Sequence, residues 1–191
     1  MPQWMILGLM GLLPALDWDS FYLLLITVLG VRICSMEGIG WPEIAGTAAL
    51  GLIALVKGTY LAFICVMLGC GLLWCLLNRQ ALRGISIFGG FALAFGFSWR
   101  ELAHQPWGNI PVWLQSTQEV ARGYQMAMGV VPDPNRLACA ILAFLLVAGS
   151  LAAGLRRSAR GAPIALLLLF GIFLAWKQGF TRGDEFHTGT F

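Results

Sequence analysis

Five ionisable side chains gather within eleven residues of the 191-residue chain, at Lys177, Arg182, Asp184, Glu185 and His187. Only 11% of the sequence is charged, so this density is unusual for the chain. An arginine is a fixed cation whose planar fork suits a phosphate or a carboxylate. Carboxylates and an imidazole can act as general base or acid near neutral pH. We therefore take Asp184, Glu185 and His187 as candidate catalytic residues and Arg182 as a candidate phosphate ligand; the alternative is a solvated interfacial loop.

Two further cations are candidate phosphate ligands. Lys57 interrupts a long apolar stretch, where ionisable groups are costly and often functional, although its side chain could instead snorkel to the membrane surface. Arg122 lies about one helical turn after Glu119, so a surface ion pair is the alternative for it. Asp17 and Asp19 flank a tryptophan and could act in catalysis, but such a pair is also typical of an interfacial turn.

The motifs of metal and cofactor sites do not occur. The acids and the histidine of the cluster match no zinc motif such as HExxH, and GxSxG, P-loop and dinucleotide patterns are absent. The five cysteines lie in apolar runs without a CxxC pair, which favours small packing residues over metal or redox work. The sequence therefore predicts neither a metal nor a soluble cofactor. A net charge of only +3 gives a nucleic-acid partner no electrostatic support.

The composition predicts an integral membrane protein with a single domain over residues 1–191. Hydrophobic residues make up 59% of the chain and the mean hydropathy is +0.79, whereas soluble domains are about 45–50% apolar. We expect an all-α, polytopic transmembrane helix bundle of about seven apolar segments. They are Trp4–Leu16, Phe21–Cys34, Ile44–Val56, Tyr60–Leu77, Gly84–Trp99, Leu137–Leu155 and Ala162–Trp176. Gly90 and Ala94, and likewise Gly149 and Ala153, have small-xxx-small spacing, which favours close helix packing within the bundle over a dimer interface.

Arginines in two loops predict the orientation. The loops Asn78–Arg83 and Arg156–Gly161 carry arginines and no acid, so the positive-inside rule places both in the cytoplasm. Alternation then puts the N-terminus in the cytoplasm and the C-terminus outside. The outer loop 100–136 and the outer tail 177–191 lie on the extracytoplasmic face with Lys57, so that all the candidate site residues share one side of the membrane.

The middle of the outer loop predicts an amphipathic helix on the membrane surface, from Trp113 to Met128. We expect this helix to have an apolar stripe along one side and a polar face on the other. The stripe comprises Val112, Trp113, Val120, Tyr124 and Met128, and the polar face comprises Gln115, Gln118, Glu119 and Arg122.

Residues 44–77 resemble a helix pair of polytopic GT-C-type glycosyltransferases, which use polyprenyl-phosphate-linked sugars. Ala54, Leu55, Val56, Lys57 and Thr59 stand where that family has its last apolar residues, lysine and threonine, with a glycine in place of the family's proline. The basic NRQALR loop follows, as it does there. Stretches of the outer loop and the tail also resemble bacterial polytopic proteins of surface-polysaccharide synthesis.

The resemblance implies a characteristic acidic residue in the first outer loop, which Asp17 or Asp19 could match. We therefore expect a membrane protein of cell-surface glycan assembly in the bacterial cytoplasmic membrane. It would bind a lipid-linked saccharide at the extracytoplasmic face and act as a glycosyltransferase if it is an enzyme. The alternatives are a non-catalytic subunit of a larger membrane complex and a transporter or channel component. Because the chain stops directly after the charged cluster, we also expect a fragment or one chain of a split protein.

Overall fold

The computed structural model describes residues 18–35, 40–128, 133–157 and 161–182, and all the regular structure in these ranges is helical. The prediction of an all-α chain is thus confirmed for the part described. The α-helices are α2 (Trp18–Ser35), α3 (Trp41–Ile53), α4 (Gly58–Leu77), α5 (Ala81–Phe97), α6 (Ile110–Met128), α7 (Pro134–Arg157) and α8 (Ala162–Arg182). A π-helical turn, Ser98–Leu102, extends α5, and a 3-10 turn, Trp107–Asn109, precedes α6.

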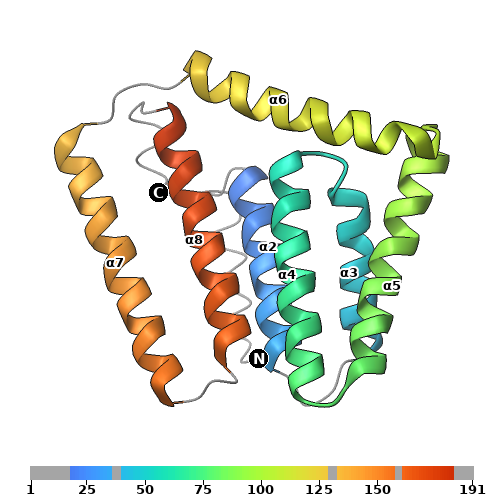
Figure 1. Cartoon of the computed structure of the whole chain (residues 1–191), viewed down its shortest axis with the longest axis horizontal. Helices are drawn as coiled ribbons and strands as arrows, with labels where there is room; N and C mark the ends of the chain where they lie inside the picture. The colour runs from blue at the N-terminus through green and yellow to red at the C-terminus, as the bar shows by residue number, and fades with distance from the viewer. Residues whose placement is uncertain (1–17, 36–39, 129–132, 158–160, 183–191) are drawn as a thin grey trace.

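Six of the α-helices stand side by side and α6 lies across one end of them (Figure 1). Six of the seven predicted apolar segments correspond to these upright helices, while Trp4–Leu16 lies outside the described residues. Because the upright helices alternate in direction, the α4–α5 turn and the α7–α8 connection lie at one end of the bundle, and α6 lies at the other (Figure 1). We refer to these as the arginine end and the α6 end.

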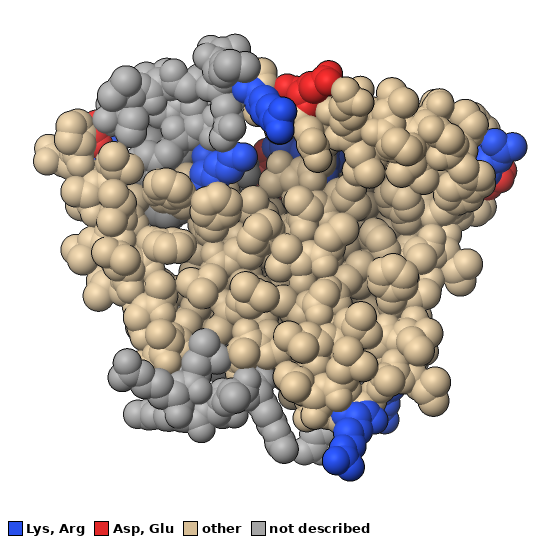
Figure 2. Space-filling model, in the orientation of Figure 1, with Lys and Arg blue, Asp and Glu red and all other residues tan. Residues whose placement is uncertain are grey.

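Three helical stretches are long and apolar enough to cross a membrane: Gly58–Leu77, Ala81–Leu102 and Pro134–Gly154. Two shorter apolar stretches, Phe21–Ser35 and Ala162–Leu174, accompany them. On the face shown in Figure 2 the charged side chains lie near the two ends of the molecule and leave an uncharged band between them. Length, composition and charge placement thus support a transmembrane helix bundle, with fewer full-length spans in the described part than the seven segments expected.

The core forms around α4, which packs against α2, α5 and α8. Phe63, Ile64 and Met67 on α4 are fully buried. The close approach of α2 depends on Gly30, where an added Cβ would lie 2.5 Å from Leu167 on α8 and 2.7 Å from Met67. The predicted break before Gly58 is present, because α3 ends at Ile53 and α4 begins at Gly58.

Helix α3 is too short to span a bilayer, since its 13 residues rise only about 20 Å. It is held against α5 by Gly51 and Gly90, whose missing side chains leave room for the other helix. Gly90 and Ala94 thus contribute to packing within the chain, as we predicted from their spacing. The second pair does not show such packing, because an added Cβ on Gly149 would meet nothing within 4 Å among the described residues.

Candidate functional site

An ionic cluster joins α2 to the start of α4 at the α6 end. Lys57 Nζ lies 2.5 Å from Asp19 Oδ2, and the Tyr60 hydroxyl donates a hydrogen bond to Asp19 Oδ1. The Tyr22 ring packs on the Tyr60 ring, with 5.1 Å between the centroids. The carboxylate therefore has both oxygens engaged, one by a cation and one by a phenol. We call Asp19, Lys57, Tyr60 and Tyr22 the Asp19 cluster.

Local backbone structure places each member of the Asp19 cluster. Asp19 lies in the first turn of α2, where a negative charge interacts favourably with the helix dipole. It is therefore helical, rather than part of the interfacial turn that we predicted. Lys57 has an extended backbone (φ −153°, ψ 134°) and forms the N-cap of α4. Tyr60 follows three residues later and so lies one turn into the helix, on the side of Lys57.

The cluster lies at the surface of the bundle. The Lys57 side chain keeps 45% of its surface exposed and the Asp19 side chain keeps 27%, whereas Tyr60 is buried at 3%. The ammonium group has three N–H donors, and the contact with Asp19 uses one of them. Lys57 therefore pairs with Asp19 and remains open to solvent, so it could contact a second anion at the same time.

Helix α6 covers the start of α4. An added Cβ on Gly58 would lie 2.0 Å from Thr117 Cγ2, so a larger residue there would require the Thr117 side chain to turn away. The N-terminal half of α6 is fixed by aromatic contacts: the Trp113 ring lies 5.4 Å from the Trp99 ring and 6.4 Å from the Phe95 ring, measured between centroids. The Trp99 indole N–H also donates to the carbonyl of Pro106 at 3.1 Å.

The amphipathic character of α6 agrees with the prediction, and one residue of the predicted apolar stripe, Trp113, faces the bundle. Ile110, Trp113 and Thr117 are the partly buried positions, at a spacing of three and four residues. Val112 and Val120, which we placed in the stripe, are 63% and 69% exposed, so they do not pack on the bundle, and their contact with a membrane surface stays a prediction. Trp113 contacts the aromatic rings of Phe95 and Trp99, and this contact sets which side of α6 faces the bundle. The side chains of Tyr124 and Met128 lie outside the description.

The other predicted site residues are only partly described. Arg122 is exposed on the polar face of α6, next to Glu119 in the helical pattern. Arg182 is the last residue of α8, which continues six residues beyond Trp176 into the region that we took as the tail. Asp184, Glu185 and His187 lie outside the described residues, as does Asp17. The proposed grouping of Arg182 with these acids therefore stays a prediction.

His104 and Arg79 have structural positions at helix ends. Each has a positive φ, 51° for His104 and 58° for Arg79, and each follows a helix terminus. The next residue then bonds back into the helix: the Gln105 N–H donates to Trp99 O at 3.1 Å, and the Gln80 N–H donates to Cys75 O at 2.7 Å. Such left-handed residues terminate helices, and glycine is the usual choice. His104 and Arg79 thus each form part of a helix stop.

Among the described residues, no three His, Cys, Asp or Glu side chains lie close enough together to bind a metal ion. What the Asp19 cluster offers is a paired, partly exposed carboxylate and cation at the α6 end of the bundle. Sequence reasoning identified Asp19 and Lys57 as separate candidates and missed Tyr60 and Tyr22. The three-residue spacing from Lys57 to Tyr60 was the available signal.

Comparison of the chain with protein-family models, with curated proteins and with solved structures gives no match.

Proposed function

We propose that the protein takes part in cell-surface glycan assembly and binds a polyprenyl-phosphate-linked saccharide at the α6 end. The contact between Asp19 and Lys57 carries the proposal. The glycosyltransferase resemblance picks out an acidic residue early in the chain and the lysine of the ALVKGT stretch on separate grounds. These two residues are 38 positions apart in the sequence, yet their side-chain atoms lie 2.5 Å apart.

The depth of the cluster fits a lipid phosphate. A polyprenyl phosphate keeps its hydrocarbon in the membrane core and its phosphate at the interface, which is where the uncharged band of the bundle ends. The half-exposed Lys57 ammonium would contact the phosphate there. Arg122 and Arg182 belong to elements at the same end (Figure 1) and would supply further phosphate contacts.

In this proposal Asp184, Glu185 or His187 provides the general base if the saccharide is transferred. The α6 end then faces the outside of a bacterial cytoplasmic membrane, and the arginine end faces the cytoplasm. The N-terminus is cytoplasmic and the C-terminus extracytoplasmic, with Trp4–Leu16 as the seventh apolar segment.

Ligand binding tests the function. In detergent micelles, we expect polyprenyl monophosphate to quench or shift the tryptophan fluorescence of the protein and the uncharged polyprenol to bind more weakly. Lys57→Ala and Arg182→Ala should each weaken binding of the phosphate about tenfold, because each removes a charge-assisted contact. Arg79→Ala, at the arginine end, is the matched control and should bind normally. Equal affinity of the protein for polyprenyl monophosphate and for polyprenol would contradict the proposal.

Topology can be tested independently of any ligand. We expect Gln118→Cys on α6 to react with a membrane-impermeant thiol reagent on intact cells, in a background without other cysteines. Gln80→Cys in the α4–α5 turn should react only after the cells are permeabilised, because the arginines beside it are retained inside. The reverse pattern of labelling would place the Asp19 cluster in the cytoplasm and exclude a site at the outer surface.

A non-catalytic subunit of a larger complex is the second candidate, and α7 favours it. This helix packs mainly on α8 and exposes Leu142, Leu145 and Leu146 by 58% to 63%. Co-purification of a stoichiometric membrane partner, lost when these leucines are replaced by tryptophan, would support it. A transporter lacks comparable support, because the buried Thr47 and Ser98 hydroxyls donate to carbonyls of their own helices.

A further inference from the structure

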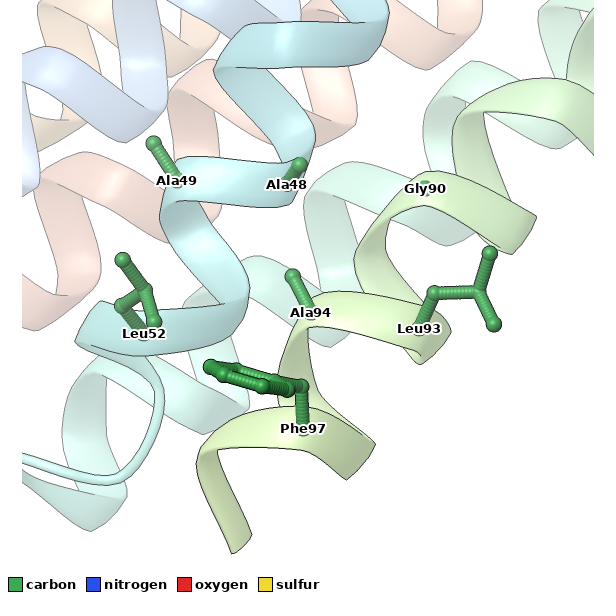
Figure 3. Close-up of a pocket in the computed structure, with 7 residues that line it drawn as sticks. All are labelled: Ala48, Ala49, Leu52, Gly90, Leu93, Ala94 and Phe97. Atoms are coloured by element: carbon green, nitrogen blue, oxygen red, sulfur yellow. The ribbon is translucent and has the colours of Figure 1, made fainter. Parts of the chain in front are cut away.

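An apolar groove runs between α3 and α5 on the outside of the bundle. Figure 3 shows seven residues lining it, and none of them has a polar side chain. They are Ala48, Ala49 and Leu52 on α3, and Gly90, Leu93, Ala94 and Phe97 on α5. Small side chains, those of the alanines and the glycine, form the floor of the groove. The larger side chains of Leu52, Leu93 and Phe97 form its walls. A hydrocarbon chain fits a groove of this shape and chemistry.

The groove exists because α3 and α5 pack so closely. An added Cβ on Gly51 would lie 2.7 Å from the backbone nitrogen of Phe95, and one on Gly90 would lie 3.1 Å from Ile44. With the backbones in contact, the outward side chains diverge from the line where the helices meet. Ala49 remains exposed beside this line, so a larger residue there would fill the groove without touching the contact between the helices.

A cation lies on the groove face of α5 at the arginine end. At about 100° per residue, Arg83, Ser86, Gly90, Ala94 and Phe97 fall within roughly a quarter of the helix circumference. Arg83 is exposed and positively charged, and its Nη1 donates to Gln80 Oε1 at 3.1 Å. The rise from Arg83 to Phe97 is about 21 Å, enough for a headgroup and the ~15 Å of hydrocarbon in one leaflet.

The α3 side of the groove has a matching interfacial residue. Trp41, Ala45, Ala49 and Leu52 share one face of α3 by their spacing of three and four residues. Trp41 begins this helix at the arginine end and is 78% exposed. Tryptophans prefer the headgroup level of a membrane. Trp41 and Arg83 thus mark the level at which the polar part of a lipid would lie, with the alanine groove leading into the membrane from it.

We infer that this groove binds one anionic phospholipid from the leaflet at the arginine end, with its phosphate at Arg83 and one acyl chain along Ala49, Gly90 and Ala94. Charge complementarity selects the anionic headgroup, since the α4–α5 turn carries Arg79 and Arg83 and no acid. The site lies at the end of the bundle opposite the Asp19 cluster and does not depend on the proposed glycan function.

Native mass spectrometry of the full chain tests the inference, with phosphatidylglycerol and phosphatidylcholine of identical acyl chains as probes. The wild type should retain phosphatidylglycerol about tenfold better. Arg83→Gln should remove this preference, and Arg136→Gln, a cation at the α6 end, should keep it. Ala49→Trp should reduce retention of both lipids, whereas Ala92→Trp, exposed on another face of α5, should not.

Equal retention of the two lipids by the wild type would overturn the inference, and so would unchanged retention in Ala49→Trp. If Arg83→Gln does not yield folded protein, Arg83→Lys keeps the charge and loses the fork, and a several-fold lower preference for phosphatidylglycerol is then expected. An unchanged preference in Arg83→Lys together with normal lipid retention in Ala49→Trp would also contradict it.

Discussion

Gly51→Ala should strongly destabilise the bundle, although it adds a single methyl group. The new Cβ would lie 2.7 Å from Phe95 N, 2.8 Å from Ala94 Cβ and 2.9 Å from Phe91 O. Two of these atoms are backbone, so the clash is relieved only if α3 and α5 separate. Overpacking of this kind costs about 3 kcal/mol, which outweighs the ~1 kcal/mol that alanine gains over glycine in helix propensity. We expect a lower thermal midpoint in detergent and a smaller monodisperse fraction by gel filtration.

Gly89→Ala is the matched control, because it makes the same substitution in α5 at a position where an added Cβ meets nothing within 4 Å. It should leave the thermal midpoint unchanged or raise it slightly. If both variants melt together with the wild type, the backbones of α3 and α5 are not in contact, and the groove between them has a different shape. The comparison therefore tests the packing on which the lipid site depends.

The helices themselves could be predicted from the sequence because apolar runs of sufficient length fold as helices in a membrane. The ends of the helices were harder to predict. Lys177 and Arg182 are good helix formers, so α8 continues through them although the apolar run has ended. Asp19 was placed in a turn by its charge, yet an acid is also favourable in the first turn of a helix, and α2 begins before it.

The sequence predicted which residues lie at the same end of the bundle, but it did not predict which helices contact one another. Alternation placed Asp19 and Lys57 on the same side of the membrane, but it carries no information about which helices are neighbours. Their pairing depends on α2 packing on α4, which the close approach at Gly30 permits. The rotation of α6 depends in the same way on the aromatic surface of α5 that receives Trp113.

The arginine end contains a second ion pair that sequence reasoning did not identify. Arg32, near the end of α2, lies 2.5 Å from Glu43 through Nε and Oε1, and Glu43 Oε2 accepts a hydrogen bond from the Gly40 N–H at 2.8 Å. The Glu43 side chain is 2% exposed and the Arg32 side chain 47%. The available signal was the spacing, since a glutamate three residues after an N-cap is typical of a capping box.

Arg32→Gln should destabilise the protein at pH 7 by about 3 kcal/mol, more than Glu43→Gln does. Removing the arginine leaves a buried carboxylate without its cation, whereas removing the carboxylate leaves an arginine that water can reach. Burial raises the pKa of Glu43, but the bonds from Arg32 and the Gly40 N–H lower it below its usual value. We expect thermal midpoints to fall in the order wild type, Glu43→Gln, Arg32→Gln.

The pH dependence of the stability of Arg32→Gln distinguishes the loss of the ion pair from the loss of side-chain packing. In the wild type the lowered pKa of Glu43 stabilises the fold above the unfolded pKa of about 4.3, and this stability is lost as the pH falls through the folded value. In Arg32→Gln the arginine no longer lowers the pKa of Glu43, so this pKa lies above its wild-type value. Protonation of Glu43 then costs the variant less stability than it costs the wild type, and the deficit of the variant should shrink as the pH falls from 7 to about 4.

The control for this pH series is Arg79→Gln, which removes an exposed arginine from the same end and should show little deficit at either pH. A deficit of Arg32→Gln that is equal at pH 7 and at about pH 4 would mean that the lost stability comes from the packing of the arginine stem on α3. A shrinking deficit would mean that Glu43 is held ionised at the start of α3 by its partner. The α2–α3 connection would then depend on an ion pair for its stability, and acidification would weaken the attachment of α3 to α2.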